Sequence, residues 1–133
     1  MRSLRLACLL TLFISTVSLA QNNSVPLINQ PLVPASAAPG SGGFTLTVNG
    51  TGFSSGSVVD WNGSSRVTAV ISTSQLKATI TAADVAKAGT ARVKVMNPAP
   101  GGGSSNPVYF PIRTSSSSVA FASTFNKTFL SPG

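Results

Sequence analysis

The sequence contains no histidine and no glutamate, and its one cysteine is Cys8. Histidine, glutamate and cysteine supply most general acids, general bases and nucleophiles, so the commonest catalytic constellations cannot be assembled. The acidic side chains are Asp60, expected in a strand, and Asp84, expected in a helix cap. These positions give no reason for the convergence that a glycosidase carboxylate pair requires. We therefore expect no catalytic residues and no enzyme activity.

Metal and nucleotide sites also lack their usual residues. Zinc would need histidine or several thiolates, and calcium would depend on backbone and asparagine oxygens with at most two carboxylates. The glycines at 50–52 and 101–103 lack the spacing and the following long helix of a dinucleotide fingerprint, so we interpret them as turns. The sequence therefore predicts no bound metal and no cofactor.

The chain is basic because acids are missing, not because bases are clustered. Nine basic residues stand against two acidic ones, which gives a net charge of +7. A nucleic-acid-binding surface normally concentrates its bases on one face or one helix. Here no run of three occurs among the seven that follow the first 20 residues: Arg66, Lys77, Lys87, Arg92, Lys94, Arg113 and Lys127. We expect a weakly basic solvated surface and no nucleic-acid partner.

The first 20 residues have the layout of a secretory signal peptide. Arg2 and Arg5 precede an apolar run over residues 6–17, and the small residues Ser18 and Ala20 follow. The run is shorter than the roughly 20 residues that cross a bilayer as a helix. We predict cleavage after residue 20, a secreted or cell-surface location, and no membrane span in the mature chain.

Most of the remaining chain alternates apolar and polar residues, as strands do when one face is buried. This alternation predicts strands at residues 44–48, 57–61, 66–71, 76–80, 91–95 and 108–112. Residues 49–52 are expected to end the first of them. Before it, residues 21–31 form a proline-rich lead-in, and pairing should start near Leu32. About seven short strands predict an all-β fold, an immunoglobulin-like antiparallel β-sandwich preceded by the signal peptide.

Two short sequence patterns predict the structure of the loops. Asn62-Gly63 is the strongest short-range signal for a β-hairpin. Thr81 and Asp84 have the spacing of a capping box, which predicts one short helical turn that Gly89 ends in a left-handed conformation. The turn is expected to connect strands, not to form a helical layer.

The alternation also assigns the faces of the strands. Trp61 shares a face with Val59 and should be mostly covered, whereas Tyr109 lies opposite its neighbours Val108 and Phe110 and should point outward. The predicted core consists of Phe44, Leu46, Val48, Phe53, Val59, Leu76, Ile80, Val93, Val95, Val108 and Phe110.

Residues 34–112 resemble the IPT/TIG domain, a family with an immunoglobulin-like fold. The similarity rests on Val-Asn-Gly-Thr-Gly-Phe at 48–53, Val-Asp-Trp-Asn-Gly at 59–63 and Ser-Gln-Leu-Lys-Ala-Thr-Ile at 74–80. The segment 89–106 is similar to the version found in secreted soil-bacterial proteins. Members of the family occur in receptor ectodomains, Rel-type transcription factors, bacterial surface proteins and polysaccharide-degrading enzymes, so the fold alone does not fix a function.

The predicted organisation is a signal peptide (1–20), the lead-in (21–31), one IPT/TIG immunoglobulin-like domain (32–113) and a last segment (114–133). That segment begins with a serine run typical of a flexible linker. Its later residues include several large apolar side chains, which we interpret as the truncated start of a following segment.

The leading functional hypothesis is a non-catalytic structural or interaction module that spaces or docks a neighbouring domain or another secreted or surface protein. The alternative is a carbohydrate- or surface-binding accessory module with polysaccharide as its partner, which would need exposed aromatic rings. Tyr109 and Trp61 are the candidate ligand contacts for that alternative. Rel-like DNA binding is opposed by the predicted export and by the scattered bases.

Overall fold

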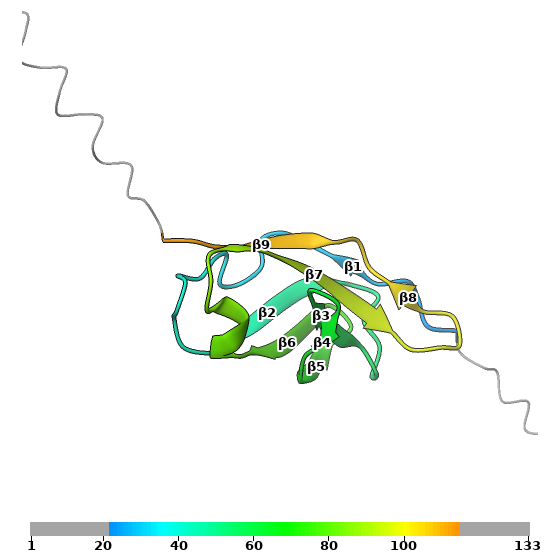
Figure 1. Cartoon of the computed structure of the whole chain (residues 1–133). Helices are drawn as coiled ribbons and strands as arrows, with labels where there is room; N and C mark the ends of the chain where they lie inside the picture. Colours follow the sequence, from blue (N-terminus) through cyan, green and yellow to red (C-terminus); the bar gives the residue numbers. More distant parts are fainter. Residues whose placement is uncertain (1–21, 115–133) are drawn as a thin grey trace, which may run out of the picture.

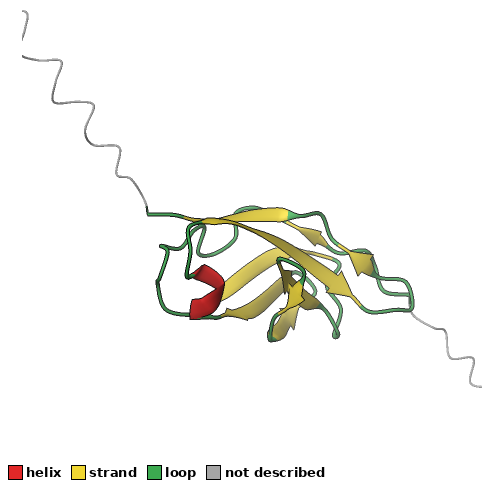
Figure 2. Ribbon diagram, in the orientation of Figure 1, coloured by secondary structure: helices red, strands yellow, loops and turns green. Residues whose placement is uncertain are grey.

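The computed structural model describes residues 22–114 of the chain. The predicted signal peptide, residues 1–20, and the segment 115–133 lie outside the described residues. Two antiparallel β-sheets enclose one hydrophobic core, and one short 3₁₀ helix is the helical element of this part (Figure 1, Figure 2). This arrangement confirms the predicted all-β fold. Between residues 22 and 114 no helix has the length and apolar character needed to span a membrane.

The two sheets are unequal in size. The four-stranded sheet has the order β1 (Leu27–Ile28), β2 (Phe44–Thr51), β6 (Gln75–Ile80) and β5 (Thr68–Ser72). The five-stranded sheet contains β4 (Ser64–Ser65), β3 (Val58–Trp61), β7 (Gly89–Asn97), β8 (Gly103–Ser104) and β9 (Val108–Ile112), and both β8 and β9 pair with β7. The helix η1 (Ala82–Val85) joins β6 to β7 across the sheets.

Alternating side chains from both sheets build the core, as the sequence predicts. In β7 the residues Ala91, Val93 and Val95 are fully buried between more exposed neighbours. Every predicted core residue is buried except Phe44, which is half-buried and stacks on Phe110 with ring centroids 5.7 Å apart. Burial of these apolar surfaces is the main stabilising contribution to a fold of this kind.

The Asn62-Gly63 hairpin is confirmed. Trp61 and Ser64 are paired across it, so the loop contains two residues, and both have positive φ, 53° and 89°. Positive φ at both loop positions is typical of a type I′ turn, whose twist matches that of the flanking strands.

Residues 66–71, predicted as one strand, are divided between the two sheets. The Arg66 amide donates to the carbonyl of Val59 in the five-stranded sheet, whereas the Val67 carbonyl accepts from Thr79 in the other sheet. The chain therefore changes sheets between residues 66 and 67, and β5 begins only at Thr68. β-Branched residues favour an extended backbone but do not specify which sheet it joins, so the prediction was wrong on this point.

The expectation that pairing begins near Leu32 was also wrong. β1 lies in the predicted lead-in and pairs with β2, with Leu27 opposite Thr51 and Ile28 opposite Gly50. β2 consequently continues through residues that we expected to end it. A Cβ atom at Gly50 would lie 2.0 Å from the Leu27 carbonyl oxygen, so this glycine permits close backbone approach instead of marking a turn.

Two short strands, β8 and β9, form the last edge of the five-stranded sheet. β8 pairs with one end of β7 and β9 with the other. Between them the Ser105 amide donates to the Val95 carbonyl, and the Val95 amide donates to the Ser105 hydroxyl. The nine short strands are two more than the pattern of about seven indicated, and the division of this edge of β7 between β8 and β9 accounts for one of the two.

The short helical turn is confirmed, but its predicted end is not. Thr81 precedes η1, and its amide donates to the Asp84 carboxylate at 2.9 Å, as in a capping box. Gly89 is already the first residue of β7 and does not adopt a left-handed helix stop. Pairing with β9 holds this glycine in extended backbone.

Candidate functional site

Trp61 is a core residue. Its side chain is 2% exposed, and its ring lies 5.3 Å from that of Phe110 at an interplanar angle of 54°. Burial of so large an aromatic group contributes strongly to stability. The prediction that Trp61 is covered is confirmed, and in this position its ring offers no face to a sugar.

Tyr109 points outward, as predicted, and is 61% exposed. It lies on the outer surface of the five-stranded sheet, opposite Arg92 in the β7–β9 register. The same surface carries the cross-strand pair Val58 and Met96, of which Met96 is 41% exposed. We call the surface formed by Val58, Asp60, Arg92, Lys94, Met96 and Tyr109 the β3–β7–β9 face.

Asp60 lies near the middle of the β3–β7–β9 face. It is opposite Lys94 on one side and Ser65 on the other. Its Oδ1 is enclosed, yet it accepts no hydrogen bond from the described residues. This strand position agrees with the sequence interpretation and gives Asp60 no second carboxylate with which to act.

Asp84, in contrast, has several partners. The Arg66 guanidinium donates from Nε to Oδ2 at 2.9 Å and from Nη2 to Oδ1, and the amide and hydroxyl of Thr81 also donate to Oδ2. The hydrogen bond from Arg66 holds the pKa of Asp84 below its ordinary 3.8, the Thr81 hydrogen bonds lower it further, and burial opposes the shift. The carboxylate therefore has a structural role beyond the predicted cap, because it ties η1 to the crossing between the sheets.

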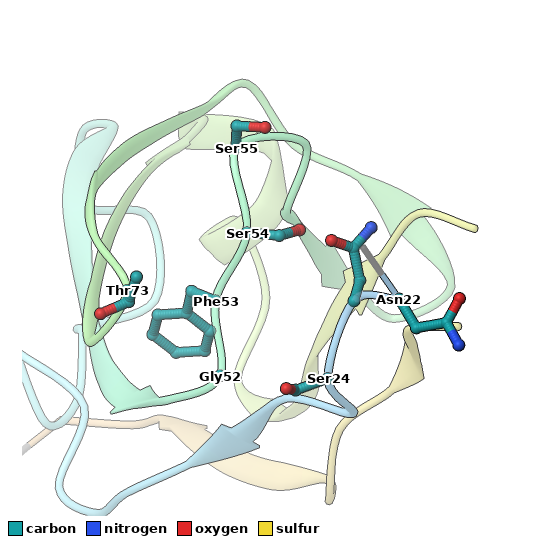
Figure 3. Close-up of a pocket in the computed structure, with 8 residues that line it drawn as sticks. Asn22, Ser24, Gly52, Phe53, Ser54, Ser55 and Thr73 are labelled. Atoms are coloured by element: carbon teal, nitrogen blue, oxygen red, sulfur yellow. The ribbon is translucent and has the colours of Figure 1, made fainter. Parts of the chain in front are cut away.

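A pocket lies where the first described residues meet the loop between β2 and β3 (Figure 3). Its volume is about 390 Å³, and it is lined by Asn22, Asn23, Ser24, Gly52, Phe53, Ser54, Ser55 and Thr73. The lining offers hydroxyls and amides without a charged side chain, which suits a small neutral polar ligand. Phe53 is only 3% exposed, however, so its ring provides little surface for stacking.

Beside this pocket lies a buried asparagine. Asn97 is 5% exposed, and its Nδ2 donates to the carbonyl oxygens of Ser24 at 2.7 Å and Gly52 at 2.6 Å. Its Oδ1 accepts from the buried Ser57 hydroxyl. Because three separate segments meet at one side chain, Asn97 fixes the walls of the pocket instead of contacting a ligand.

The described part of the chain contains no group of three histidine, cysteine, aspartate or glutamate side chains that could hold a metal ion. Asp60 lies in β3, and Asp84 is engaged by Arg66 and Thr81. The geometry of residues 22–114 thus gathers no carboxylates into an acid–base site.

Two antiparallel sheets packed around one hydrophobic core are the architecture that immunoglobulin-like families share. The family model described as IPT/TIG domain matches residues 30–112, more than half of the chain. The chain belongs to the IPT/TIG domain family. Domains of this family are immunoglobulin-like modules, generally non-catalytic and generally involved in protein interaction. A search of curated proteins found no match.

Sequence reasoning missed one further feature of this IPT/TIG domain. The exposed side chain of Asn106 accepts from the Ile28 amide at 2.8 Å and donates to the Ile28 carbonyl at 3.1 Å. Its amide thereby replaces a backbone peptide between β1 and the break that separates β8 from β9. Local patterns carry no signal for such a pairing, because the two residues are 78 positions apart.

Proposed function

We propose that this IPT/TIG domain is a non-catalytic module of a secreted or cell-surface protein, in which it spaces or docks a neighbouring domain. The positions at which the described chain enters and leaves the domain support the proposal. The described part begins at Asn22, next to the bridge between Asn23 and Gly101, and ends at Thr114, beyond the pairing of Ile112 with Gly89. These two positions lie at opposite ends of the sandwich (Figure 1).

The length of β7 gives the separation between the entry and the exit of the described chain. β7 contains nine residues; the described chain leaves beside its first residue, Gly89, and enters beside the loop that follows its last residue, Asn97, so the length of β7 approximates the separation. Eight steps of about 3.3 Å make this distance about 26 Å. With the signal peptide removed, the entry end lies at the start of the mature chain, so the domain holds a segment attached at its exit end away from whatever the entry end contacts, whereas a flexible linker would let the two approach.

The β3–β7–β9 face supports a docking role. Tyrosine, arginine and methionine are enriched in protein interfaces, and Tyr109, Arg92 and Met96 are all exposed on this face. Arg92 and Lys94 outnumber the single acid Asp60 there, so the face is complementary to an acidic protein surface. The secretory pattern of the first 20 residues supports the location.

The spacing role is tested by placing the chain between two reporter domains and measuring small-angle X-ray scattering. The matched control replaces residues 22–114 with a glycine-serine linker of equal residue number. We expect a fixed separation with the domain and a broad range of separations with the linker. Equally broad distributions would contradict spacing. Mass spectrometry of exported protein tests the location, and a mature form that still carries Met1 would contradict it.

Carbohydrate binding is a second candidate, favoured by the exposed Tyr109 and the neutral polar pocket. One ring is a small platform, and Trp61 does not extend it. We therefore expect affinities weaker than roughly 1 mM, about 4 kcal/mol of binding free energy, for soluble cellulose, xylan and chitin oligomers. Calorimetric titration of the wild type and Tyr109→Ala tests this. Tight binding that is lost in Tyr109→Ala would favour the carbohydrate function.

A further inference from the structure

β5 is an edge strand of the four-stranded sheet, with β6 on one side and no strand on the other among the described residues (Figure 1). The Thr79 amide donates to the Val67 carbonyl, which marks a hydrogen-bonded position of the β5–β6 ladder. Bonded and non-bonded pairs alternate along an antiparallel ladder, so the pairs that Thr68 and Val70 form with β6 are non-bonded. Their amides and carbonyls therefore point away from β6. No other segment of residues 22–114 bonds to them.

The other edges of the two sheets are covered or short. The Asn106 side chain pairs with the Ile28 backbone on the outer side of β1. Beside β9, the Ala37 amide donates to the Pro111 carbonyl, and the Ala37 carbonyl accepts from the Arg113 amide. β4 and β8 contain two residues each. Folded proteins use such covering and shortening to keep sheet edges from pairing with other chains, and within residues 22–114 β5 lacks this protection.

The composition of the β5 edge favours addition of a strand. Residues 67–71 read Val-Thr-Ala-Val-Ile, with neither a charge nor a proline. β-Branched residues fit extended strands, whereas charged residues and prolines oppose edge pairing. Val67 is 80% exposed and Ile71 is 53% exposed, so two large apolar side chains of this edge lie in water. The β5–β6 register shifts only between Val70 and Ser72, beyond the outward-pointing backbone groups.

This edge is complementary to a second copy of itself. An antiparallel partner strand centred on Ala69 places Thr68 of each copy opposite Val70 of the other. These are the residues whose backbone groups point outward, and each of the two pairs can exchange two hydrogen bonds. Ala69 then meets its counterpart in a non-bonded pair, where Cα atoms lie about 4.5 Å apart, a distance that methyl side chains permit. Val67 meets Ile71 of the other copy, so these exposed side chains cover one another.

Electrostatic repulsion does not oppose this register. Lys77 is the charged residue paired with the centre of β5, opposite Ala69. Two copies joined at β5 hold their Lys77 residues three strand spacings apart, about 14 Å, which exceeds the Debye length of about 8 Å at physiological salt. The pairing merges two four-stranded sheets into one sheet with a two-fold axis, the commonest symmetry of soluble oligomers. It uses no residue of the β3–β7–β9 face.

We propose that this IPT/TIG domain self-associates through β5, forming a two-fold dimer with an antiparallel β5–β5 pair centred on Ala69. The inference goes beyond the proposed spacing or docking function and does not depend on it. Five residues from each copy make a small interface, so the association should be weak and concentration-dependent, as small transient interfaces are.

The first test is sedimentation equilibrium of the exported protein at concentrations up to roughly 1 mM. The mass of the wild type should rise toward twice that of the monomer. Ala69→Glu places like charges opposite each other at the two-fold axis and should weaken association about tenfold or more. Within one copy the new carboxylate faces Lys77, which favours the fold. The matched control Thr45→Glu adds the same charge to an exposed residue of β2, away from the edge, and should associate like the wild type.

The second test is a mixture of Ala69→Glu and Ala69→Lys, which reports the register. Position 69 meets itself in the proposed pair, so mixing should restore the association that each variant lacks alone. Urea unfolding of each variant checks the fold, and if Ala69→Lys did not fold, the comparison of Ala69→Glu with Thr45→Glu would decide alone. A wild type that stays monomeric, an Ala69→Glu variant that associates like the wild type, or a mixture of folded variants without recovery would each overturn the proposal.

Discussion

Replacing Asn97 with alanine should lower the free energy of unfolding by about 2 to 4 kcal/mol. The side chain makes three hydrogen bonds, to the carbonyls of Ser24 and Gly52 and from the hydroxyl of Ser57. A typical hydrogen bond contributes about 1 kcal/mol net, and each buried partner left unsatisfied costs about 1 to 3 kcal/mol. Because Asn97 is 5% exposed, water reaches these partners poorly and can replace only part of the loss.

Urea unfolding followed by tryptophan fluorescence measures this change, because Trp61 is buried in the native state and becomes exposed on unfolding. The matched control is Asn29→Ala, the same substitution at an exposed residue, which should change stability by less than about 0.5 kcal/mol. A loss at Asn97 no larger than that at Asn29 would refute the view that Asn97 joins three segments.

Three further predictions concern packing. Val93→Ala should cost about 1 to 4 kcal/mol through lost burial and a cavity, whereas the exposed Thr45→Ala should be near neutral in the same urea titration; equal tolerance would show that the faces are reversed. Gly50→Ala should cost about 2 kcal/mol or more, because its Cβ meets the Leu27 carbonyl oxygen, and unchanged stability would place β1 elsewhere. Trp61 emission should be blue-shifted and unchanged by soluble sugars; red-shifted emission that one sugar quenches would contradict its burial.

Periodic burial made the central strands and their faces predictable. In β7 the buried Val93 and Val95 alternate with Arg92 and Lys94, and this pattern is fully present in the local sequence. The same reasoning placed Trp61 inside and Tyr109 outside, because a side chain in a strand takes the face opposite its neighbours. Tight turns were equally predictable where the turn needs two residues with positive φ, as at Asn62-Gly63.

Features that depend on distant polar contacts could not be read in this way. β1 is two residues long and has no alternation to detect, and its position depends on Gly50 and on the amide of Asn106. Asn97 precedes a proline, and the glycines at 101–103 that follow were interpreted as a turn, so local rules gave no sign of a buried junction. Side-chain amides can substitute for backbone pairing anywhere in a chain, and only the folded arrangement shows which of them do.

The Arg66–Asp84 ion pair gives a prediction for acid pH. The pKa of Asp84 is held below 3.8 mainly by the hydrogen bond from Arg66. A carboxylate with a lower pKa in the folded state stabilises the protein fully above the unfolded pKa, and this contribution is lost as pH falls through the folded pKa. Stability should therefore be level above about pH 5 and decrease below about pH 4.

Few groups can contribute to this acid-dependent change in stability, because Asp60 and Asp84 are the only acidic side chains of the chain. Asp84→Asn removes the titrating group while retaining a similar shape. We expect this variant to be less stable than the wild type at pH 6 but to lose little more between pH 5 and pH 3, so the two stability curves should converge in acid. Urea midpoints measured at half-unit pH intervals test this. If Asp84→Asn kept the full acid-dependent decrease, the decrease would have another source, and the ion pair would contribute nothing measurable to the junction between η1 and the sheet crossing.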